Sequence, residues 1–130
     1  MSESEKTIYN SKENVLKELL LNYGINSTEY QRRQLLKHIE LLIEINKNLN
    51  LTRITSVDDA LVLHILDSLL PLKVCNEFLS GTHNYIDIGT GGGFPGLPLA
   101  ILSENKTLLV DSIRKKINAV QSMIYEIGLN

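Results

Sequence analysis

The sequence contains a single cysteine, no tryptophan and few other aromatic residues, and each shortage excludes a class of protein. Cys75 alone cannot build a disulfide framework or a zinc site, so a disulfide scaffold and a zinc module are excluded. Five tyrosines and two phenylalanines show no platform for stacking single-stranded bases. The formal net charge of −2 does not indicate a nucleic-acid-binding fold by itself. Any contact with nucleic acid must therefore come from a local patch.

No stretch is suited to export or to a membrane. Residues 1–14 are polar and of mixed charge, so no signal peptide is visible. The longest apolar stretch, ALVLHILDSLLPL, is interrupted by His64, Asp67 and Pro71 and is too short to span a bilayer. A single thiol fits a reducing compartment, and we expect a cytoplasmic protein. A hydrophobic content of 43% is sufficient for the core of one compact domain.

Residues 11–80 have the spacing of three or four packed helices. The second helix is expected to run to about Asn46 or Leu49 and the third to Pro71. Start and stop signals bound these helices: a glycine that can adopt a left-handed C-terminal conformation and two N-cap pairs. These signals are Gly24, Thr28 with Gln31, and Ser56 with Asp59. The apolar stripes of the first two helices comprise Val15, Leu16, Leu19, Leu20, Leu35, Leu36, Ile39, Leu42 and Ile43.

The pattern changes near Gly81, where two short β-like runs alternate with two helical segments. NYIDIG and KTLLVD predict strands, whereas FPGLPLAIL and SIRKKINAVQSMIYEIG predict helices, the second ending at Gly128. The order β-α-β-α implies parallel strands and a right-handed crossover. The apolar face of the last helix is expected to comprise Ile113, Ile117, Val120 and Ile124. We therefore expect an α/β protein with a helical region at residues 1–80 and an α/β unit at residues 81–130.

Five glycines within eight residues follow the first predicted strand, in the stretch DIGTGGGFPG. Glycine permits positive φ angles and, because it has no Cβ, allows a ligand to reach the backbone. The helix that follows offers unpaired N–H groups. A P-loop is excluded, because Leu97 and Pro98 stand where Lys and Ser or Thr are required. A ligand-free turn would not need five glycines, so a nucleotide-type ligand is favoured.

Two cofactors fit this loop. A dinucleotide is possible because Gly91, Gly93 and Gly96 satisfy the G-x-G-x-x-G pattern. The acidic-x-Gly-x-Gly-x-Gly pattern of S-adenosylmethionine sites is also present, at Asp87, Gly89, Gly91 and Gly93. Asp87 can hold an ammonium group, whereas it would repel a pyrophosphate, and this favours S-adenosylmethionine. Asp111, at the end of the second strand, offers a carboxylate for the ribose hydroxyls of either cofactor.

Four motifs, taken together at this spacing, resemble those of a known family. They are NLT at residues 50–52, HILDSL at 64–69, GTGGGFPGLPLAI at 89–101 and LLVDS at 108–112. With them the sequence resembles the RsmG family, also called glucose-inhibited division protein B. Members of that family are bacterial methyltransferases that transfer a methyl group from S-adenosylmethionine to N7 of a guanine in 16S ribosomal RNA. The resemblance extends from about Tyr23 to the end of the sequence.

The resemblance implies a short helical region leading into a Rossmann-like methyltransferase sheet of seven strands. It implies cofactor contacts at Gly89 and Phe94, with Asp87, Gly91 and Gly93 shaping the same loop and Asp111 as the ribose ligand. Guanine N7 already carries a lone pair, so the reaction needs positioning and exclusion of water more than a base. No catalytic residue and no metal ligand are assigned.

Members of the family continue for several strands beyond the two expected here. We therefore expect a C-terminally truncated part of such an enzyme, whose own activity depends on the absent strands. A two-stranded sheet is marginal alone and its edges invite pairing, so we expect low stability or self-association through the exposed sheet edge. Two alternatives stay open: a non-catalytic module that binds itself or a partner, and a fragment of a nicotinamide-dependent oxidoreductase.

Two further groups of residues are candidates for function. His64, Asp67 and Ser68 have the i, i+3, i+4 spacing of one helix face, and either close over the cofactor loop or form a polar buttress, which we favour. Basic residues could contact the phosphates of the ribosomal RNA. The first basic patch comprises Arg32, Arg33, Lys37 and His38, with Lys47 and Arg53 further along, and the second comprises Arg114, Lys115 and Lys116.

Overall fold

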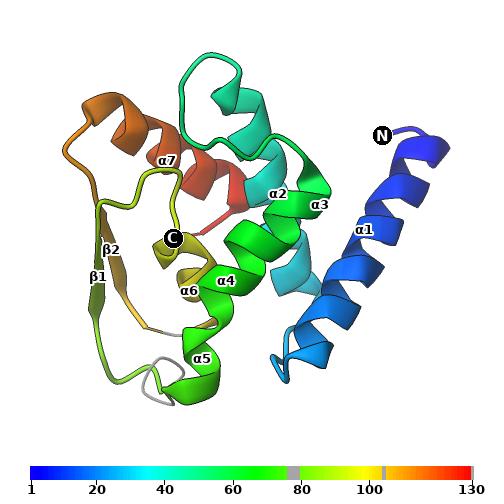
Figure 1. The fold of residues 1–130 in the computed structure, drawn as a ribbon, viewed down its shortest axis with the longest axis horizontal. Helices are drawn as coiled ribbons and strands as arrows, with labels where there is room; N and C mark the ends of the chain where they lie inside the picture. The colour runs from blue at the N-terminus through cyan, green and yellow to red at the C-terminus, as the bar shows by residue number, and fades with distance from the viewer. Residues whose placement is uncertain (76–79, 104, 130) are drawn as a thin grey trace.

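The computed structural model of the chain describes residues 1–75, 80–103 and 105–129, with a helical first part and an α/β second part (Figure 1). The second part runs through strand β1 (Tyr85–Ile88), helix α6 (Gly96–Leu102), strand β2 (Thr107–Val110) and helix α7 (Arg114–Ile127). This order confirms the expected α/β class, in which a helical region leads into a β-α-β-α unit. Within the described residues, no helix is both long enough and apolar enough to cross a membrane.

The first helix, α1 (Glu3–Asn22), begins well before residue 11, where the apolar pattern predicted its start. A capping box accounts for the earlier start, because Glu5 N donates to Ser2 Oγ (3.2 Å) and Ser2 N donates to the Glu5 carboxylate (2.6 Å). The first turns of α1 are mostly polar and exposed, so apolar periodicity could not reveal them.

Two residues assigned to apolar helix faces are exposed, and those assignments are wrong. Val15 is 49% exposed because α1 presents only a narrow face, including Leu16 and Leu20, to the rest of the molecule. Ile113 is 46% exposed because it is the N-cap residue of α7 and lies outside the helical turns. The buried residues of α7 are Val120, Met123 and Ile127. Its end is as predicted, at Gly128 with φ +79°.

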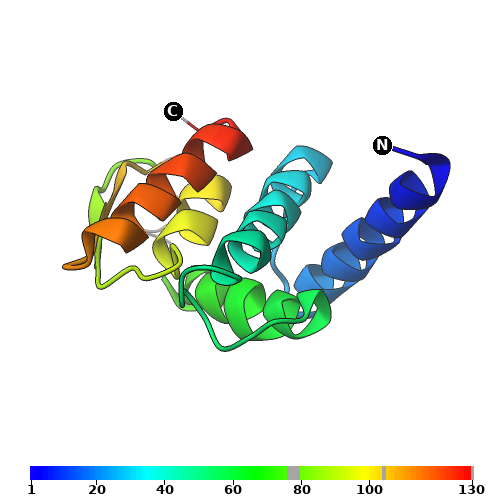
Figure 2. The same cartoon turned by 90° about the horizontal axis from the view of Figure 1, so that it is seen from above.

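Helix α2 (Glu29–Asn46) lies between α1 and the α/β unit (Figure 2). The predicted capping box is confirmed, since Gln31 N donates to Thr28 Oγ1 (3.1 Å) and Thr28 N donates to Gln31 Oε1 (2.9 Å). Gly24, with φ +70°, turns the chain after α1 as expected. Because α2 is flanked on two sides, its buried residues extend beyond the apolar stripe. They include Leu35, Leu36, His38, Ile39 and Leu42.

The third helical stretch is continuous but changes its pitch. It comprises α3 (Val57–Ala60), a π-helical turn η1 (Leu61–Leu66), α4 (Asp67–Leu69) and α5 (Pro71–Val74). Ser56 caps its start as predicted, because its Oγ accepts a hydrogen bond from Asp59 N (3.2 Å). A π-helical turn is rare and often lies at a functional site. This one carries His64.

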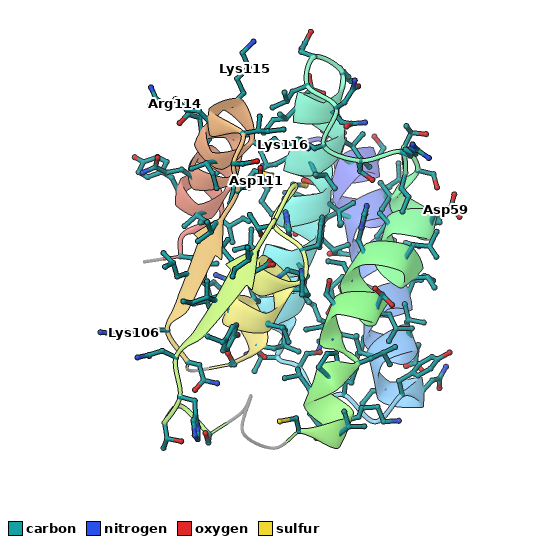
Figure 3. All side chains as sticks on the ribbon, turned by 60° about the vertical axis from the view of Figure 1, so that its left-hand side comes forward. Asp59, Lys106, Asp111, Arg114, Lys115 and Lys116 are labelled. Carbon is teal, nitrogen blue, oxygen red and sulfur yellow. The ribbon has the colours of Figure 1, made fainter. Side chains whose placement is uncertain are left out.

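Strands β1 and β2 pair in parallel, as predicted, with Tyr85 opposite Thr107. Tyr85 and Leu109 pack toward the core, while the alternate side chains form a bare apolar face. This bare face comprises Ile86 (60% exposed), Ile88 (82%), Leu108 (57%) and Val110 (37%). Figure 3 shows Lys106 and Asp111 at opposite ends of β2. Asp111 therefore marks the carboxyl edge of the sheet, where open α/β sheets bind ligands.

The helical region and the α/β unit share one hydrophobic core. Helix α2 packs against both α6 and α7, and α4 packs against α6. Fully buried side chains come from both parts of the chain and include Leu16, Leu35, Ile39, Ile65, Leu69, Leu97 and Met123. The expected boundary between residues 80 and 81 thus separates two stretches of chain that are packed together.

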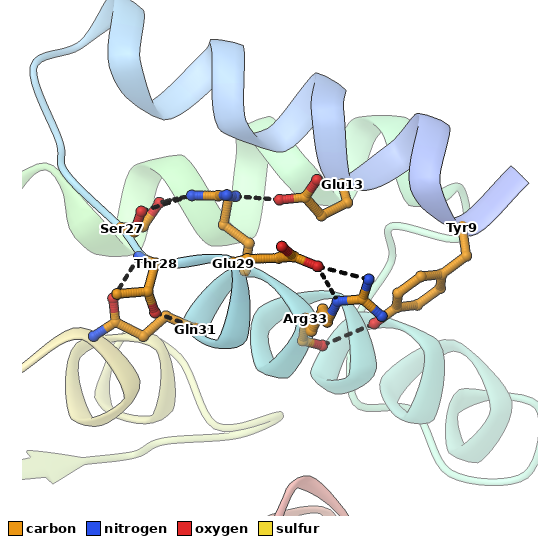
Figure 4. Close-up of polar contacts among 8 residues, drawn as sticks. Tyr9, Glu13, Ser27, Thr28, Glu29, Gln31 and Arg33 are labelled. Atoms are coloured by element: carbon orange, nitrogen blue, oxygen red, sulfur yellow. Dashed lines mark hydrogen bonds and ion pairs between the residues drawn. The ribbon is translucent and has the colours of Figure 1, made fainter. Parts of the chain in front are cut away.

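Arg32 of α2 and Glu13 of α1 form a buried ion pair between the two helices (Figure 4). Their side chains are only 8% and 12% exposed, and Arg32 Nη1 also donates to Ser27 O (2.6 Å). The neighbouring Arg33 pairs with Glu29 (2.7 Å) on the surface, where the two side chains are 48% and 63% exposed. Adjacent arginines of one helix therefore form one buried and one exposed pair.

Replacing Arg32 with alanine would leave the Glu13 carboxylate buried without a counter-charge. We expect Arg32→Ala to lower the free energy of unfolding by about 3–5 kcal/mol. Arg33→Ala is the matched control, because the exposed pair that it removes contributes less than about 1 kcal/mol. Urea unfolding followed by circular dichroism measures both losses. Equal losses in the two variants would contradict a structural role for the buried pair.

Candidate functional site

The glycine loop, residues 89–96, begins directly after β1 and leads into α6. As predicted, it uses positive φ angles, which are +79° at Gly89, +57° at Gly91 and +97° at Gly93. Its start is fixed to the second strand, because Gly89 N and Thr90 N both donate to Val110 O (2.7 and 2.9 Å). The loop therefore lies at the carboxyl edge of the strand pair.

The glycines of this loop fall into two groups. At Gly92 and Gly96 an added Cβ would lie 2.6 Å from Leu42 Cδ1 and 2.2 Å from Leu109 Cδ2, so the protein itself fills that space. At Gly89 and Gly91 a Cβ would meet no described atom within 4 Å. Gly93 belongs with the packed group, since its Cβ would lie 3.2 Å from a histidine nitrogen. The backbone is thus open to a ligand at Gly89 and Gly91.

Asp87 joins the two ends of the loop. Its Oδ2 accepts hydrogen bonds from Thr90 Oγ1 (2.7 Å) and from Gly96 N (2.9 Å). The carboxylate that the sequence assigned to the methionine end of a cofactor therefore also braces the loop. Its second oxygen, Oδ1, can still accept a hydrogen bond from a ligand.

Asp111 holds the same loop from the second strand. Its Oδ2 accepts a hydrogen bond from Gly91 N and its Oδ1 accepts one from Ile113 N, both at 2.9 Å. Because the N–H groups of Ile113 and Gly91 stabilise the charged form, the pKa of Asp111 lies below its ordinary value. A carboxylate oxygen has further lone-pair capacity, so this arrangement is compatible with a ribose hydroxyl as an additional donor.

Phe94, at the end of the glycine run, lies against two histidines of the helical region. Its ring stacks on His38 of α2, with centroids 4.4 Å apart and planes 16° apart. It also stacks on His64 of η1, at 4.3 Å and 8°. We call His38, Phe94 and His64 the ring stack. It connects the loop to the helices.

His64 also connects two of the motifs that carried the family resemblance. Its Nε2 lies 2.7 Å from Oγ1 of Thr52, the last residue of the NLT motif. Asn46 Oδ1 accepts hydrogen bonds from Leu51 N (2.8 Å) and Thr52 N (3.0 Å), which fixes the turn after α2. The NLT, HILDSL and glycine-loop motifs therefore meet at His64.

The three residues expected on one helix face, His64, Asp67 and Ser68, differ in burial. His64 is half-buried against the loop, Asp67 is exposed and Ser68 is buried. Of the three, His64 stacks on Phe94 of the loop.

Two residues of the first basic patch are not available for RNA, and those predictions are corrected. Arg32 is buried in its pair with Glu13. His38 is completely buried, and its Nε2 lies 2.8 Å from Gly92 O. His38 is also the residue of the ring stack that sequence reasoning missed. Its position between Leu35 and Leu42 in the buried stripe of α2 could have placed it in the core.

The remaining basic residues are accessible to differing degrees. Arg33 and Arg53 are exposed, and Lys37 is half-buried. Arg114 and Lys115 are exposed in the first turn of α7, near Asp111 (Figure 3). Within residues 1–75, 80–103 and 105–129, no three His, Cys, Asp or Glu side chains are grouped to hold a metal ion.

A parallel strand pair, a glycine loop and an aspartate in or just after each strand define the opening unit of a Rossmann-like α/β fold. The family model for rRNA small subunit methyltransferase G (GidB) matches residues 31–130. The chain belongs to this family.

Curated relatives support the assignment. A ribosomal RNA small subunit methyltransferase G of Aeromonas hydrophila is 46% identical over 112 residues, which are 85% of this chain and 50% of that protein. One of Actinobacillus pleuropneumoniae is 44% identical over 115 residues, with 88% and 54% coverage. One of Lactobacillus johnsonii is 35% identical over 112 residues, with 85% and 47% coverage. The chain spans about half the length of these relatives.

Burial makes the stability of the chain depend on pH through His38. Complete burial lowers the pKa of His38 to about 4, below the value of about 6.5 for a histidine in an unfolded chain. Between these values the unfolded state binds more protons than the folded state. The stabilisation is therefore complete above about pH 6.5 and is lost as the pH falls through about 4.

We expect the free energy of unfolding to decrease by up to about 3 kcal/mol between pH 7 and pH 4 because of His38. His38→Gln keeps a side-chain N–H for Gly92 O but does not titrate, so most of this slope should disappear. Burial also lowers the pKa of His64, which leaves a residual slope of the same sign. Urea unfolding across this pH range measures the effect, and an unchanged slope in His38→Gln would refute it.

Proposed function

We propose that this chain forms part of an S-adenosylmethionine-dependent methyltransferase that acts on N7 of a guanine in 16S ribosomal RNA. The observation that carries the proposal is the open backbone at Gly89 and Gly91, flanked by Asp87 and Asp111. Family membership supports the reaction class, because the matching relatives are named ribosomal RNA small subunit methyltransferase G.

The residues fit the cofactor on physical grounds. At Gly89 and Gly91 the space that a Cβ would fill is left to a ligand. In this proposal Asp87 orients the methionine end, Gly89, Gly91 and Gly93 permit the loop conformation, and Asp111 receives the ribose hydroxyls. Phe94 closes the loop and walls the pocket. When bound, S-adenosylmethionine supplies an activated methyl group.

Methyl transfer to guanine N7 requires little from the protein beyond positioning of the reactants. Guanine N7 carries a lone pair and loses no proton when it is methylated, so no general base is required. The contribution of these residues is to hold the loop, orient the bound cofactor and exclude water from the reacting atoms. This is consistent with an assignment that names no catalytic acid, base or metal.

The proposal includes contact with RNA phosphates through accessible basic residues. In the helical region these are the exposed Arg33 and Arg53 and the half-buried Lys37. In the α/β unit they are the exposed Arg114 and Lys115 and the half-buried Lys116. Phosphate contacts position an RNA without reading its sequence. A ribosomal RNA substrate also implies a cytoplasmic location. We retain the division into a helical region, residues 1–80, and a methyltransferase region, residues 81–130.

The chain provides a matched pair of glycines to test the cofactor site. Gly89 and Gly128 both have φ +79° and both have open space at the position of a Cβ. Alanine at either position therefore costs about 1–2 kcal/mol of backbone strain. We expect Gly89→Ala to weaken binding of S-adenosylmethionine by about tenfold or more, because its Cβ enters the space of the ligand. Gly128→Ala should bind like the wild type.

Isothermal titration calorimetry with S-adenosylmethionine, with NADH as competitor, measures this difference. Displacement by NADH would favour the nicotinamide alternative. Equal binding by Gly89→Ala and the wild type would remove the loop from the cofactor site. A wild-type chain that does not bind at all would refute the proposal for this chain and favour the non-catalytic alternative.

We also propose that the chain associates with a second copy through the sheet. In the described part of the chain each strand pairs with one other strand, so one edge of each pairs with no further strand there. The bare apolar face, of which Ile88 is the most exposed residue, adjoins these edges. Edge-to-edge pairing of two copies would extend the sheet, and packing of their bare apolar faces against each other would cover the apolar side chains.

A charge on the bare apolar face should prevent this association. We expect Ile88→Lys to shift the chain toward the monomer by at least about tenfold in dissociation constant, because a lysine would be desolvated in the interface. Val74→Lys is the control, since Val74 is 88% exposed and lies in α5, outside the sheet. Sedimentation velocity across a concentration series measures the equilibrium. A monomeric wild type would rule out the association.

A further inference from the structure

The ring stack joins three segments that are far apart in the sequence. His38 comes from α2, His64 from the π-helical turn η1 and Phe94 from the glycine loop. The planes of both histidine rings are within 16° of the Phe94 plane, at centroid distances of 4.4 and 4.3 Å. Two imidazoles this close and this parallel do not fit side by side on one face of a phenyl ring. The histidines therefore cover opposite faces of Phe94.

A covered ring cannot serve as a stacking surface for a ligand. With His38 on one face and His64 on the other, only the edge of the half-buried Phe94 ring is left to solvent. The open side of the loop is at Gly89 and Gly91. The side of the loop that packs on the helices and the side that is open to a ligand are therefore different.

His38 holds the loop at a second point. Gly92 O is an acceptor, so His38 Nε2 must carry the proton and donate to it at 2.8 Å. His38 Nδ1 is then an acceptor, and it has no hydrogen-bond partner in the part of the chain that the structure describes. A buried nitrogen without a partner costs free energy. The side chain stays in place because its ring and its Nε2 are both engaged by the loop.

The segment between these two points forms a tight turn. Gly93 N and Phe94 N both donate to Thr90 O, at 2.9 and 3.0 Å. His64 is in turn fixed by Thr52 Oγ1 at 2.7 Å. The turn at residues 90–94 is thus fastened to α2 through His38 and to the third helix through His64.

We propose that the ring stack orders the glycine loop before any ligand arrives, so that the ring of Phe94 acts through the position of the loop and not by stacking its face on the ligand. His38 and His64 then influence ligand affinity without touching the ligand. The part of this inference that concerns cofactor affinity rests on the proposed function. The part that concerns loop order does not, and it can be measured in the ligand-free chain.

Two substitutions at His64 separate the stacking from the hydrogen bond. His64→Phe keeps an aromatic ring against Phe94 but loses the bond to Thr52, whereas His64→Gln keeps a polar group for Thr52 but loses the ring. An aromatic pair stabilises the packed state of the loop. Its loss should therefore accelerate exchange of the Gly93 and Phe94 amides about three- to tenfold. We expect this acceleration in His64→Gln and exchange within about twofold of the wild type in His64→Phe.

Amide hydrogen exchange by NMR in the ligand-free chain is the measurement, and Gly89 N, which donates to Val110 O, is the internal reference. Unchanged exchange in His64→Gln, or the same change in both variants, would overturn the proposal. Equal acceleration at Gly89 would also overturn it, because the stack would then stabilise the whole unit and not the loop. If His64→Gln fails to fold, His38→Gln, which keeps a donor for Gly92 O, gives the same readout.

A second measurement tests the effect on affinity. Phe94→Leu keeps an apolar side chain but removes the ring, and it should weaken S-adenosylmethionine binding by the factor by which it accelerates loop exchange, or less. Weaker binding with unchanged exchange would mean that the ring touches the ligand directly, and would overturn the positioning role. If the wild type does not bind, the proposed function fails, while the exchange experiment still decides whether the stack orders the loop.

Discussion

The absence of a Cβ at Gly92 and Gly96 is the constraint on which the rest of this structure depends. At Gly92 the loop lies directly against Leu42 of α2, and at Gly96 it lies directly against Leu109 of β2. A close approach on both sides brings the helices and the strands to the same short stretch of backbone. The shared core, the ring stack and the position of the open glycines all follow from this double contact.

The loop is held mainly by groups that satisfy its own backbone. Asp87 and Asp111 receive the N–H groups of Gly96 and Gly91, and Val110 O receives two more. Carboxylates that accept hydrogen bonds from backbone N–H groups make stronger bonds than neutral acceptors do. When a ligand binds a loop that is already ordered, little of the binding free energy is lost to ordering the loop. The two side chains that hold the loop are therefore also the two that are proposed to meet the ligand.

Local signals predicted most of the fold. The capping residues Thr28 and Ser56 and the left-handed glycines depend on a few neighbouring residues, so the sequence is sufficient to identify them. The ring stack could not be predicted in this way, because His38 and Gly92 are 54 positions apart. The same holds for Arg32, whose partner Glu13 is 19 positions away. A charge count treats His38 and Arg32 as surface residues, although the apolar spacing around His38 indicates burial. The π-helical turn left no signal that a regular helical period could reveal.

The buried pair of Arg32 and Glu13 has a consequence for how this sequence can vary. Arg32 lies within the part that matches the family model, whereas Glu13 lies before it. Loss of either charge alone leaves the other buried and unpaired, but replacement of both by apolar residues of similar volume need not destabilise the fold. Positions 13 and 32 are therefore expected to change together among related sequences. A homologue without an acidic residue in its first helix should have an uncharged residue at the position of Arg32.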